Sequence, residues 1–133
     1  QDMELIHQME HYKAVYHQWE QLDVALVNIG NYSSVPDFAA AARYGEMLST
    51  RRPAGRLLAY FYDDEGKILR SDTDYAIQIP TGVLARCPNV IGICSANVTP
   101  RTLLGALRTG LITHLIAREW LVQEALERCG GSI

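Results

Sequence analysis

Two stretches of the 133-residue sequence carry side chains whose types and spacing could do chemistry. His7 and His11 frame a His-x-x-Glu-His run, and two imidazoles four residues apart on one helix could bind zinc. A catalytic zinc also needs a third protein ligand and an enclosed cleft. This pair lies roughly opposite the apolar positions Leu5, Met9 and Tyr12. We therefore interpret it as a solvated polar helix face, since motif matches this short arise by chance.

Other residues that could do chemistry have simpler structural explanations. Asp63, Asp64, Asp72 and Asp74 could supply a general base, but Asp favours turns through local backbone hydrogen bonds. His114 stands in an apolar run, which indicates a buried, hydrogen-bonded histidine rather than a metal ligand. We find no nucleophile elbow. The sequence therefore predicts no enzyme activity, and we expect no metal or cofactor.

The second stretch is the polar loop 95–99, which precedes a predicted helix that begins at Pro100. It carries Ser95, Asn97 and Thr99, with Arg101 just inside the helix. Free backbone N–H groups and the helix dipole at such a position favour an anion or a polyol. The loop lacks a glycine-rich phosphate signature, so an ordinary connecting loop remains the alternative.

The elements that must position this loop form a βαβ unit: a strand at 89–94, a helix over 100–110 and a strand at 111–117. Thr99 caps the helix and Gly110 ends it. The remaining elements are predicted from apolar spacing and turn residues. They are a helix over 2–21, a strand at 22–29 covered by helices on both faces, a helix over 36–49, a strand at 56–62, a turn at 63–66 into an antiparallel strand at 67–70, an extended segment at 75–79, a short helix from Pro80 to about 87, and a helix over 118–128. This alternation predicts an α/β fold with a mostly parallel sheet of about four main strands and an antiparallel hairpin.

Composition narrows the function classes. The net charge is −3 and the basic residues are scattered, which excludes a basic stripe able to neutralise a row of phosphates. Three cysteines without metal-site spacing fit reduced thiols, so we expect a cytoplasmic protein. No apolar run approaches the roughly 20 residues of a membrane span. The chain does not begin with Met, and we expect it to be a fragment.

Several segments in order carry a family resemblance: 22–30 (LDVALVNIG), 55–66 (GRLLAYFYDDEG), 88–93 (PNVIGI), 106–112 (ALRTGLI) and 115–116 (LI). Together they resemble the SorC family of bacterial sugar-responsive transcription regulators. The resemblance implies a Rossmann-like fold flanked by helices and similar to the sugar-phosphate isomerase group. It further implies that residues 1–133 are the C-terminal part of an effector-binding domain. The helix-turn-helix and the first half of that domain, with its phosphate-binding loop, would lie outside.

The family's acidic sugar-binding residue falls on Arg56, and the hydrophobic position two residues further on falls on Leu58. Arginine donates five hydrogen bonds and accepts none, so it suits a carboxylate or phosphate better than a neutral hydroxyl. Two interpretations stay open. Arg56 binds a second anionic group of the effector, or it pairs with a protein carboxylate such as Asp63 or one in the missing half.

The remaining effector positions also depart from the family pattern. The Gly-Gly pair falls on Ser95 and Ala96, the lysine that opens the next helix falls on Thr99, and the aspartate of a Val-Thr-Asp segment falls on Arg118. With the loop residues named above, the predicted effector-binding set is Arg56, Leu58, Ser95, Ala96, Asn97, Thr99 and Arg101.

The resemblance implies an effector-sensing domain that binds a phosphorylated sugar or related anionic metabolite and so modulates DNA binding and oligomerisation. Operator DNA would be read only by a domain outside this chain, and no membrane is involved. The apolar helix positions from Leu5 to Trp19 and the hairpin are candidate subunit contacts. The alternatives are a sugar-phosphate isomerase-like enzyme and an oligomerisation scaffold that has lost its ligand.

Overall fold

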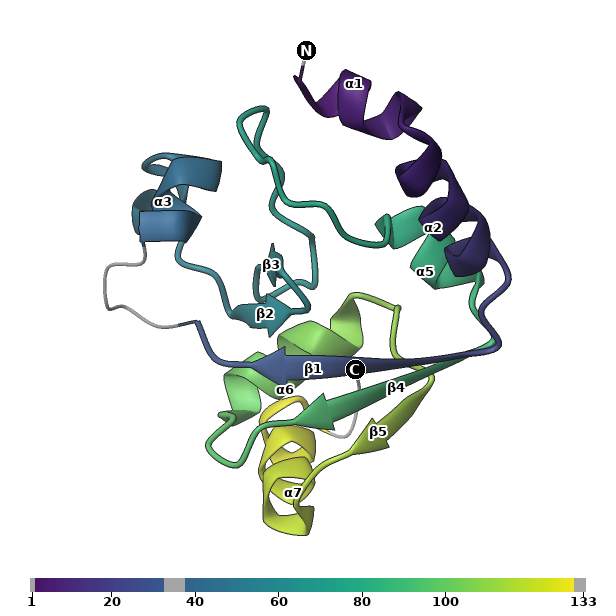
Figure 1. The fold of residues 1–133 in the computed structure, drawn as a ribbon. Coiled ribbons are helices and arrows are strands. Elements are labelled where there is room, and N and C mark those ends of the chain that lie inside the picture. The colour runs from purple at the N-terminus through teal and green to yellow at the C-terminus, as the bar shows by residue number, and fades with distance from the viewer. Residues whose placement is uncertain (1, 33–37, 131–133) are drawn as a thin grey trace.

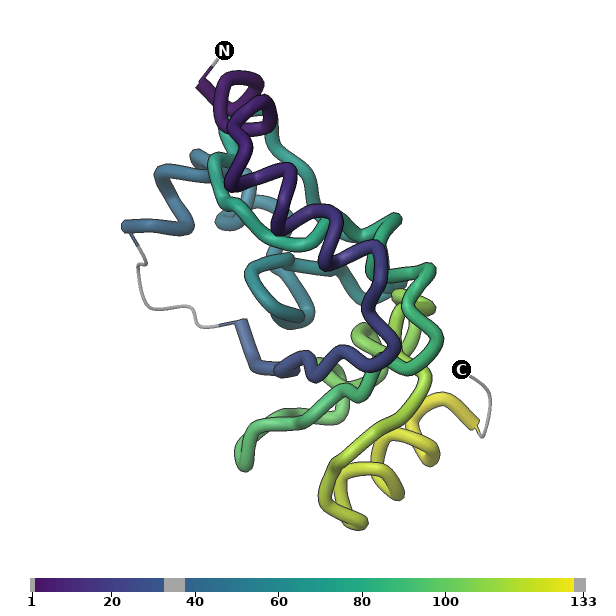
Figure 2. The backbone as a smooth tube through the Cα atoms, turned by 45° about the vertical axis from the view of Figure 1, so that its right-hand side comes forward, coloured from purple at the N-terminus to yellow at the C-terminus, as the bar shows by residue number. Residues whose placement is uncertain are grey.

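The computed structural model describes residues 2–32 and 38–130. Helices and strands are interspersed along the described chain, with α1 at one end of the molecule and α7 at the other (Figures 1 and 2). The elements are α1 (Asp2–Gln8), α2 (Glu10–Glu20), β1 (Val24–Gly30), α3 (Phe38–Tyr44), α4 (Met47–Thr50), β2 (Gly55–Leu57), β3 (Tyr60–Tyr62), α5 (Thr81–Arg86), β4 (Asn89–Cys94), α6 (Pro100–Arg108), β5 (His114–Ile116) and α7 (Glu119–Arg128).

The strands form one mixed sheet in the order β3-β2-β1-β4-β5. The pairs β1–β4 and β4–β5 are parallel, whereas β1–β2 and β2–β3 are antiparallel. The expected α/β class is therefore confirmed, but the sheet is evenly mixed rather than mostly parallel. The difference arises at 56–62, which we expected to be one strand. Leu58, in the left-handed region at φ +54°, turns this segment into the tight hairpin of β2 and β3.

The βαβ unit of β4, α6 and β5 is confirmed, with β4 at the predicted 89–94. Thr99 caps α6 by accepting a hydrogen bond from the backbone N–H of Thr102 at 3.3 Å, and Pro100 takes the first helical position. Gly110 follows the helix in the left-handed region at φ +74°. The predicted short helix after Pro80 and the last helix are also present as α5 and α7.

The core lies on one side of β1. Val27 and Ile29 point into it and pack with Leu57, Tyr62 and Val90, whereas a second cluster joins α3 and α4 to Phe61 and Leu69, and a third joins α6 to α7. The expectation that β1 is covered on both faces is wrong. Val24 is 50% exposed and Leu26 is 65% exposed, because alternate residues of a strand point to opposite faces and residues 2–32 and 38–130 cover only one of them.

Three further expectations need correction. The helix predicted over 2–21 is interrupted at Met9, whose ψ of 141° is extended, so His7 and His11 lie on different helices. The His7 ring instead lies 4.6 Å from the Tyr12 ring. His114 is exposed rather than buried, because it lies on the uncovered face of β5; its Nδ1 is 2.8 Å from the Thr113 hydroxyl.

The hairpin predicted at 63–66 exists as a turn with little sheet beyond it. The Asp63 carboxylate accepts hydrogen bonds from the backbone N–H groups of Glu65 and Lys67, at 3.0 and 2.9 Å. The strand expected at 67–70 is reduced to a single bridge between Tyr62 and Ile68. Segment 75–79 is extended without strand pairing, and the first residues of the helix expected over 36–49 lie outside the described residues.

Arg43 fastens α3 to the loop before α5. Its guanidinium donates to both Asp74 carboxylate oxygens, at 2.6 and 3.1 Å, and to the Ala59 carbonyl at 2.7 Å. Tyr44 adds a hydroxyl donor to Asp74 at 3.2 Å. Burial by itself would raise the pKa of the Asp74 carboxyl, but the hydrogen bonds from Arg43 and from the Ala76 N–H hold that pKa below its ordinary value.

A carboxyl with a lowered pKa stabilises the fold above its unfolded value of about 3.9, and the stabilisation is lost as the pH falls through the folded value. We therefore expect the free energy of unfolding to fall steeply below about pH 4. Asp74→Asn should flatten this dependence and cost about 1.5–3 kcal/mol at pH 7, because Arg43 loses a charged acceptor. Urea unfolding at several pH values measures both effects. Asp72→Asn, an exposed neighbour, is the control; an unchanged acid slope in Asp74→Asn would contradict the assignment.

Substitutions at two glycines with positive φ distinguish the cost of backbone strain from the cost of steric overlap. Gly66 has φ +83°, and a Cβ there would overlap the backbone of Arg108 and Thr109 at the end of α6. Gly110 has φ +74° with nothing within 4 Å of such a Cβ. We expect Gly110→Ala to cost about 1–2 kcal/mol of unfolding free energy. Gly66→Ala should cost clearly more, and equal losses in urea unfolding would refute the close packing of this turn on α6.

Candidate functional site

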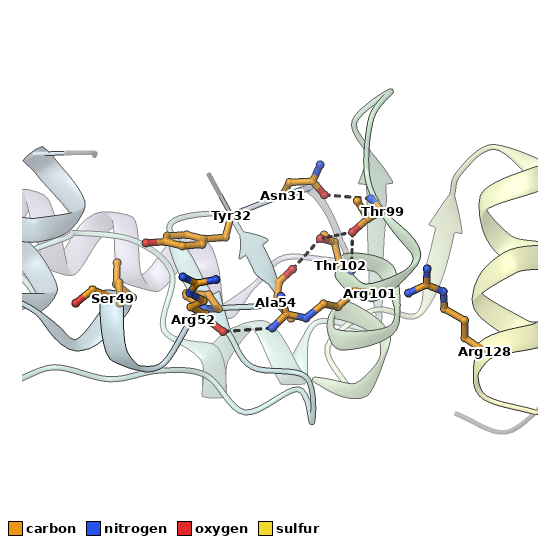
Figure 3. Close-up of a pocket in the computed structure, with 11 residues that line it drawn as sticks. Asn31, Tyr32, Ser49, Arg52, Ala54, Thr99, Arg101, Thr102 and Arg128 are labelled. Carbon is orange, nitrogen blue, oxygen red and sulfur yellow. Dashed lines mark hydrogen bonds between the residues drawn. The ribbon is translucent and has the colours of Figure 1, made fainter. Parts of the chain in front are cut away.

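A cavity of about 640 Å³ lies where β1 and β4 end and α6 begins (Figure 3). Each wall comes from a different part of the chain: the loop after β1, helix α4, the segment before β2, the start of α6, and α7. Its lining residues are Asn31, Tyr32, Leu48, Ser49, Arg52, Pro53, Ala54, Thr99, Arg101, Thr102 and Arg128. The sheet edge predicted to bind a ligand is therefore hollow.

Asn31 holds together the two loops that meet at this edge. Its side-chain amide donates to the Asn97 carbonyl at 2.8 Å, and its side-chain oxygen accepts from the Thr99 N–H at 3.1 Å. Ser95 adds a backbone hydrogen bond to the Ile29 carbonyl at 3.1 Å. The start of α6 is thus fixed relative to β1 by hydrogen bonds on both sides of the loop.

The inner wall of the cavity is built on a buried hydroxyl pair. Thr102 is 2% exposed and donates to the Ala54 carbonyl at 2.7 Å, while the Tyr62 hydroxyl donates to the Thr102 carbonyl at 2.7 Å. Burial raises the pKa of Tyr62, so this phenol stays protonated. Gly55 is required here, because a Cβ would overlap the Tyr62 hydroxyl and the Thr102 methyl group.

Three arginines give the cavity its charge. Arg101 is held by Asp64, with N–O distances of 2.5 and 3.0 Å, and its hydrogen bonds lower the pKa of the Asp64 carboxyl. Arg52 and Arg128 are exposed, and within residues 2–32 and 38–130 no carboxylate lies within 4.0 Å of their side-chain nitrogens. Figure 3 shows Arg101 and Arg128 entering from neighbouring helices, α6 and α7.

Hydroxyl groups surround these cations. Thr99, Ser49 and Tyr32 line the same space. Guanidinium groups bind carboxylates and phosphates, whereas hydroxyls exchange hydrogen bonds with a polyol. The arrangement can hold a small anion that also carries hydroxyl groups. Among the described residues no group of three or more His, Cys, Asp or Glu side chains could hold a metal ion.

The residues predicted to bind an effector are divided between two places. Thr99 and Arg101 line the cavity, and Asn97 supports it through its carbonyl. Ser95 and exposed Ala96 lie in the same loop, where the Ser95 hydroxyl is 3.4 Å from the Asn28 side-chain oxygen.

Arg56 and Leu58 lie away from the cavity. Arg56 pairs in register with Gly30 and is exposed, between the buried neighbours Gly55 and Leu57, so it belongs to the uncovered face of the sheet. Its expected partner Asp63 is instead 3.9 Å from Arg51. Leu58 forms part of a separate apolar groove, and Arg118 precedes α7 at its N-cap.

Sequence reasoning missed Asn31, Arg52 and Arg128. The sequence could have predicted Asn31, because it follows β1 just as Ser95 follows β4. The carboxyl ends of neighbouring parallel strands lie at the same edge of a sheet. Arg52 lies in the basic, turn-forming segment 51–55 (RRPAG), whose composition indicates a chain break before β2 and not a binding site. Arg128 stands 27 residues after Arg101 in the sequence, and only the packing of α7 against α6 brings it to the cavity.

No helix among the described residues is both long and apolar enough to cross a membrane.

Comparisons with known proteins place the chain in a family. The family model described as "Putative sugar-binding domain" matches residues 1–127. The sorbitol operon regulator of Klebsiella pneumoniae is 30% identical over 116 residues, which are 84% of this chain and 37% of that protein.

Two solved structures share the fold. The full-length K. pneumoniae sorbitol operon regulator SorC aligns with a TM-score of 0.73 at 28% identity, over 92% of this chain and 42% of that one. A probable sor operon regulator from Shigella flexneri aligns with a TM-score of 0.76 at 26% identity, over 93% of this chain and 50% of that one. The chain thus spans half or less of these relatives. With the family model covering nearly its whole length, the resemblance is confirmed: the chain belongs to the sugar-binding domain family of SorC-type transcriptional regulators.

Proposed function

We propose that this chain is the C-terminal part of the effector-sensing domain of a bacterial transcription regulator. It binds a phosphorylated sugar or a related anionic metabolite in the cytoplasm, and binding modulates oligomerisation and DNA binding. DNA is read by a domain outside the chain. The observation that carries the proposal is the cavity at the start of α6, which gathers the guanidiniums of Arg52, Arg101 and Arg128 beside hydroxyl groups.

The size and charge of the cavity support a metabolite rather than a macromolecule. About 640 Å³ lies within the range of small-molecule sites, roughly 300–1,000 Å³. Arg101 is already neutralised by Asp64, so the attraction for an anion comes chiefly from Arg52 and Arg128. Their exposure leaves them screened by salt, and the N-terminus of α6 adds a favourable dipole.

Arg56 is proposed to bind a second anionic group. It has no carboxylate within 4.0 Å in the described part of the chain, and it stands near Asn28 at the end of the uncovered sheet face. An arginine at the position of the family's acid changes the ligand preference from hydroxyl donors to anionic acceptors.

The Rossmann-like arrangement is proposed to be related to the sugar-phosphate isomerase group without its catalytic residues. Asp64, which pairs with the cavity residue Arg101, has a carboxyl pKa below its ordinary value, which makes it a weak general base. Binding without bond breaking then acts by shifting the equilibrium between assemblies. Such a shift requires different effector affinity in the two states.

Thermal unfolding with a panel of neutral sugars, sugar phosphates, sugar acids and sugar bisphosphates tests the proposal. The protein is a chimera in which this chain replaces the matched region of the K. pneumoniae sorbitol operon regulator. A bound phosphorylated ligand at 100 times its Kd should add about 2.7 kcal/mol, which raises the Tm of a protein of this size by about 5–10 °C. Arg52→Ala and Arg128→Ala should each remove most of this shift.

Arg86→Ala is the matched control, because Arg86 is exposed on α5 and does not line the cavity. It should leave the shift unchanged. Equal shifts with neutral and phosphorylated sugars, or no shift with any member of the panel, would refute the proposal.

Arg56→Ala distinguishes the second anionic group. We expect it to reduce the Tm shift given by doubly anionic ligands, the bisphosphates and phosphorylated sugar acids, and to leave singly phosphorylated sugars unaffected. A loss shared by all phosphorylated ligands would place Arg56 at the first anionic group instead. No loss with any ligand would exclude Arg56 from the site.

A further inference from the structure

The uncovered face of the sheet is apolar across three neighbouring parallel strands. We call it the open sheet face, formed by Val24, Leu26, Ile91, Ile93 and Ile116. Register places Leu26 beside Ile91, and Ile93 beside Ile116. Leu26 is 65% exposed and Ile116 is 57% exposed, whereas Val27, which points to the other face, is 2% exposed. The two faces of the same strands are therefore both apolar, and only one is buried.

An apolar groove of about 310 Å³ runs along β1 beside this face. Val24 and Leu26 line it from the open sheet face, and core residues such as Val27 and Leu84 line it from the covered side. Polar residues bound the open sheet face, with Asn28 and Arg56 near one end of the strands, Asn89 near the other, and His114 on the edge strand β5 beside Ile91. An apolar centre inside a polar rim is the composition of a buried interface.

Parallel strands are normally covered by helices on both faces, because the crossovers between them carry helices. Here α6, the crossover from β4 to β5, packs with α7 in the core on the opposite face. The solved relatives carry as much chain again: this chain aligns with 50% of one and 42% of another.

We propose that the open sheet face is the interface for the part of the domain that the relatives carry and this chain does not span. The apolar sides of helices from that part pack on Leu26, Ile91, Ile93 and Ile116. The interface rests on the proposed placement of this chain within a longer regulator. It does not depend on which effector binds.

Thiol labelling measures whether the face is covered. Leu26→Cys is introduced into the 133-residue chain and into the chimera described above, and iodoacetamide labelling is followed by peptide mass spectrometry. We expect rapid labelling in the isolated chain and labelling at least about tenfold slower in the chimera, because covered residues react only on local opening. Equal rates in both proteins would overturn the proposal.

Two variants serve as controls for this measurement. Val27→Cys, on the buried face of the same strand, should label slowly in both proteins. Leu126→Cys, at a site 42% exposed on α7, should label rapidly in both. The native thiol of Cys87, 6% exposed, reports folding, since it reacts quickly only in an unfolded protein. Fast labelling of Cys87 in the chimera would show that the chimera is unfolded. In that case the 133-residue chain is mixed with the unmatched part of the K. pneumoniae regulator, supplied as a separate chain. Slower labelling of Leu26→Cys in this mixture supports the proposal, and an unchanged rate overturns it.

A second copy of the chain is the competing occupant. Slow labelling of Leu26→Cys in the isolated chain, together with a dimer in sedimentation velocity, would show that a second copy covers the face and would overturn the proposal. The Tm shifts given by the effector panel are measured on the chimera in a separate experiment. Protection of Leu26→Cys without any ligand-dependent Tm shift would refute the proposed function and leave the interface in place.

Discussion

The docking of α6 against β2 and β3 is the constraint on which the rest of the structure depends. Two buried hydroxyl groups secure it, since Thr102 donates to the Ala54 carbonyl and Tyr62 donates to the Thr102 carbonyl. Leaving either acceptor unsatisfied in the core would cost about 1–3 kcal/mol. A Cβ on Gly55 or Gly105 would overlap the Tyr62 ring or hydroxyl, so the close approach needs both glycines. Because α6 is placed in this way, its N-terminus opens at the edge where β1 and β4 end.

The docking of α6 also positions the charged side chains at the edge where β1 and β4 end. The turn at 63–66 packs on the end of α6, where Arg108 donates to the Asp64 carbonyl at 3.0 Å, and the Asp64 carboxylate reaches Arg101. This ion pair spans exposed side chains, and its stability contribution is at most about 1 kcal/mol. Its stronger effect is on position, since it holds the Arg101 guanidinium in place and leaves Arg52 and Arg128 as the cations that we propose attract an anion. The cavity therefore combines a fixed wall with two cations that a ligand can order.

The open sheet face and the cavity share strands β1 and β4. The loops after these strands form part of the cavity, and alternate residues within the strands form the open sheet face. A ligand that changes the position of either loop relative to its strand also acts on whatever packs on that face. This common framework is a physical route by which effector binding could bias one assembly over another, provided that the two assemblies differ in affinity.

The sequence by itself determined the βαβ unit of β4, α6 and β5 and the family. The βαβ unit followed from Thr99, Pro100 and Gly110, whose capping and turn preferences depend on neighbouring backbone alone. The polar loop 95–99 after β4 was predicted from the same local signals, because it lies between an apolar strand and the Thr99-Pro100 helix start. Segments such as LDVALVNIG were enough for the resemblance that the family model confirmed.

Only the tertiary structure decided which faces are covered and which distant residues meet. The sequence of β1 is apolar at successive positions, which fits burial on both faces, yet one face of this chain is open because α6 and α7 lie on the other. The hairpin at Leu58 was missed because a leucine at φ +54° is stabilised by surrounding contacts rather than by its own preference. Arg128 reaches the cavity through helix packing, which no local spacing encodes. Periodicity reports the preference of each segment, whereas covering a face or closing a cavity depends on contacts between segments far apart in the chain.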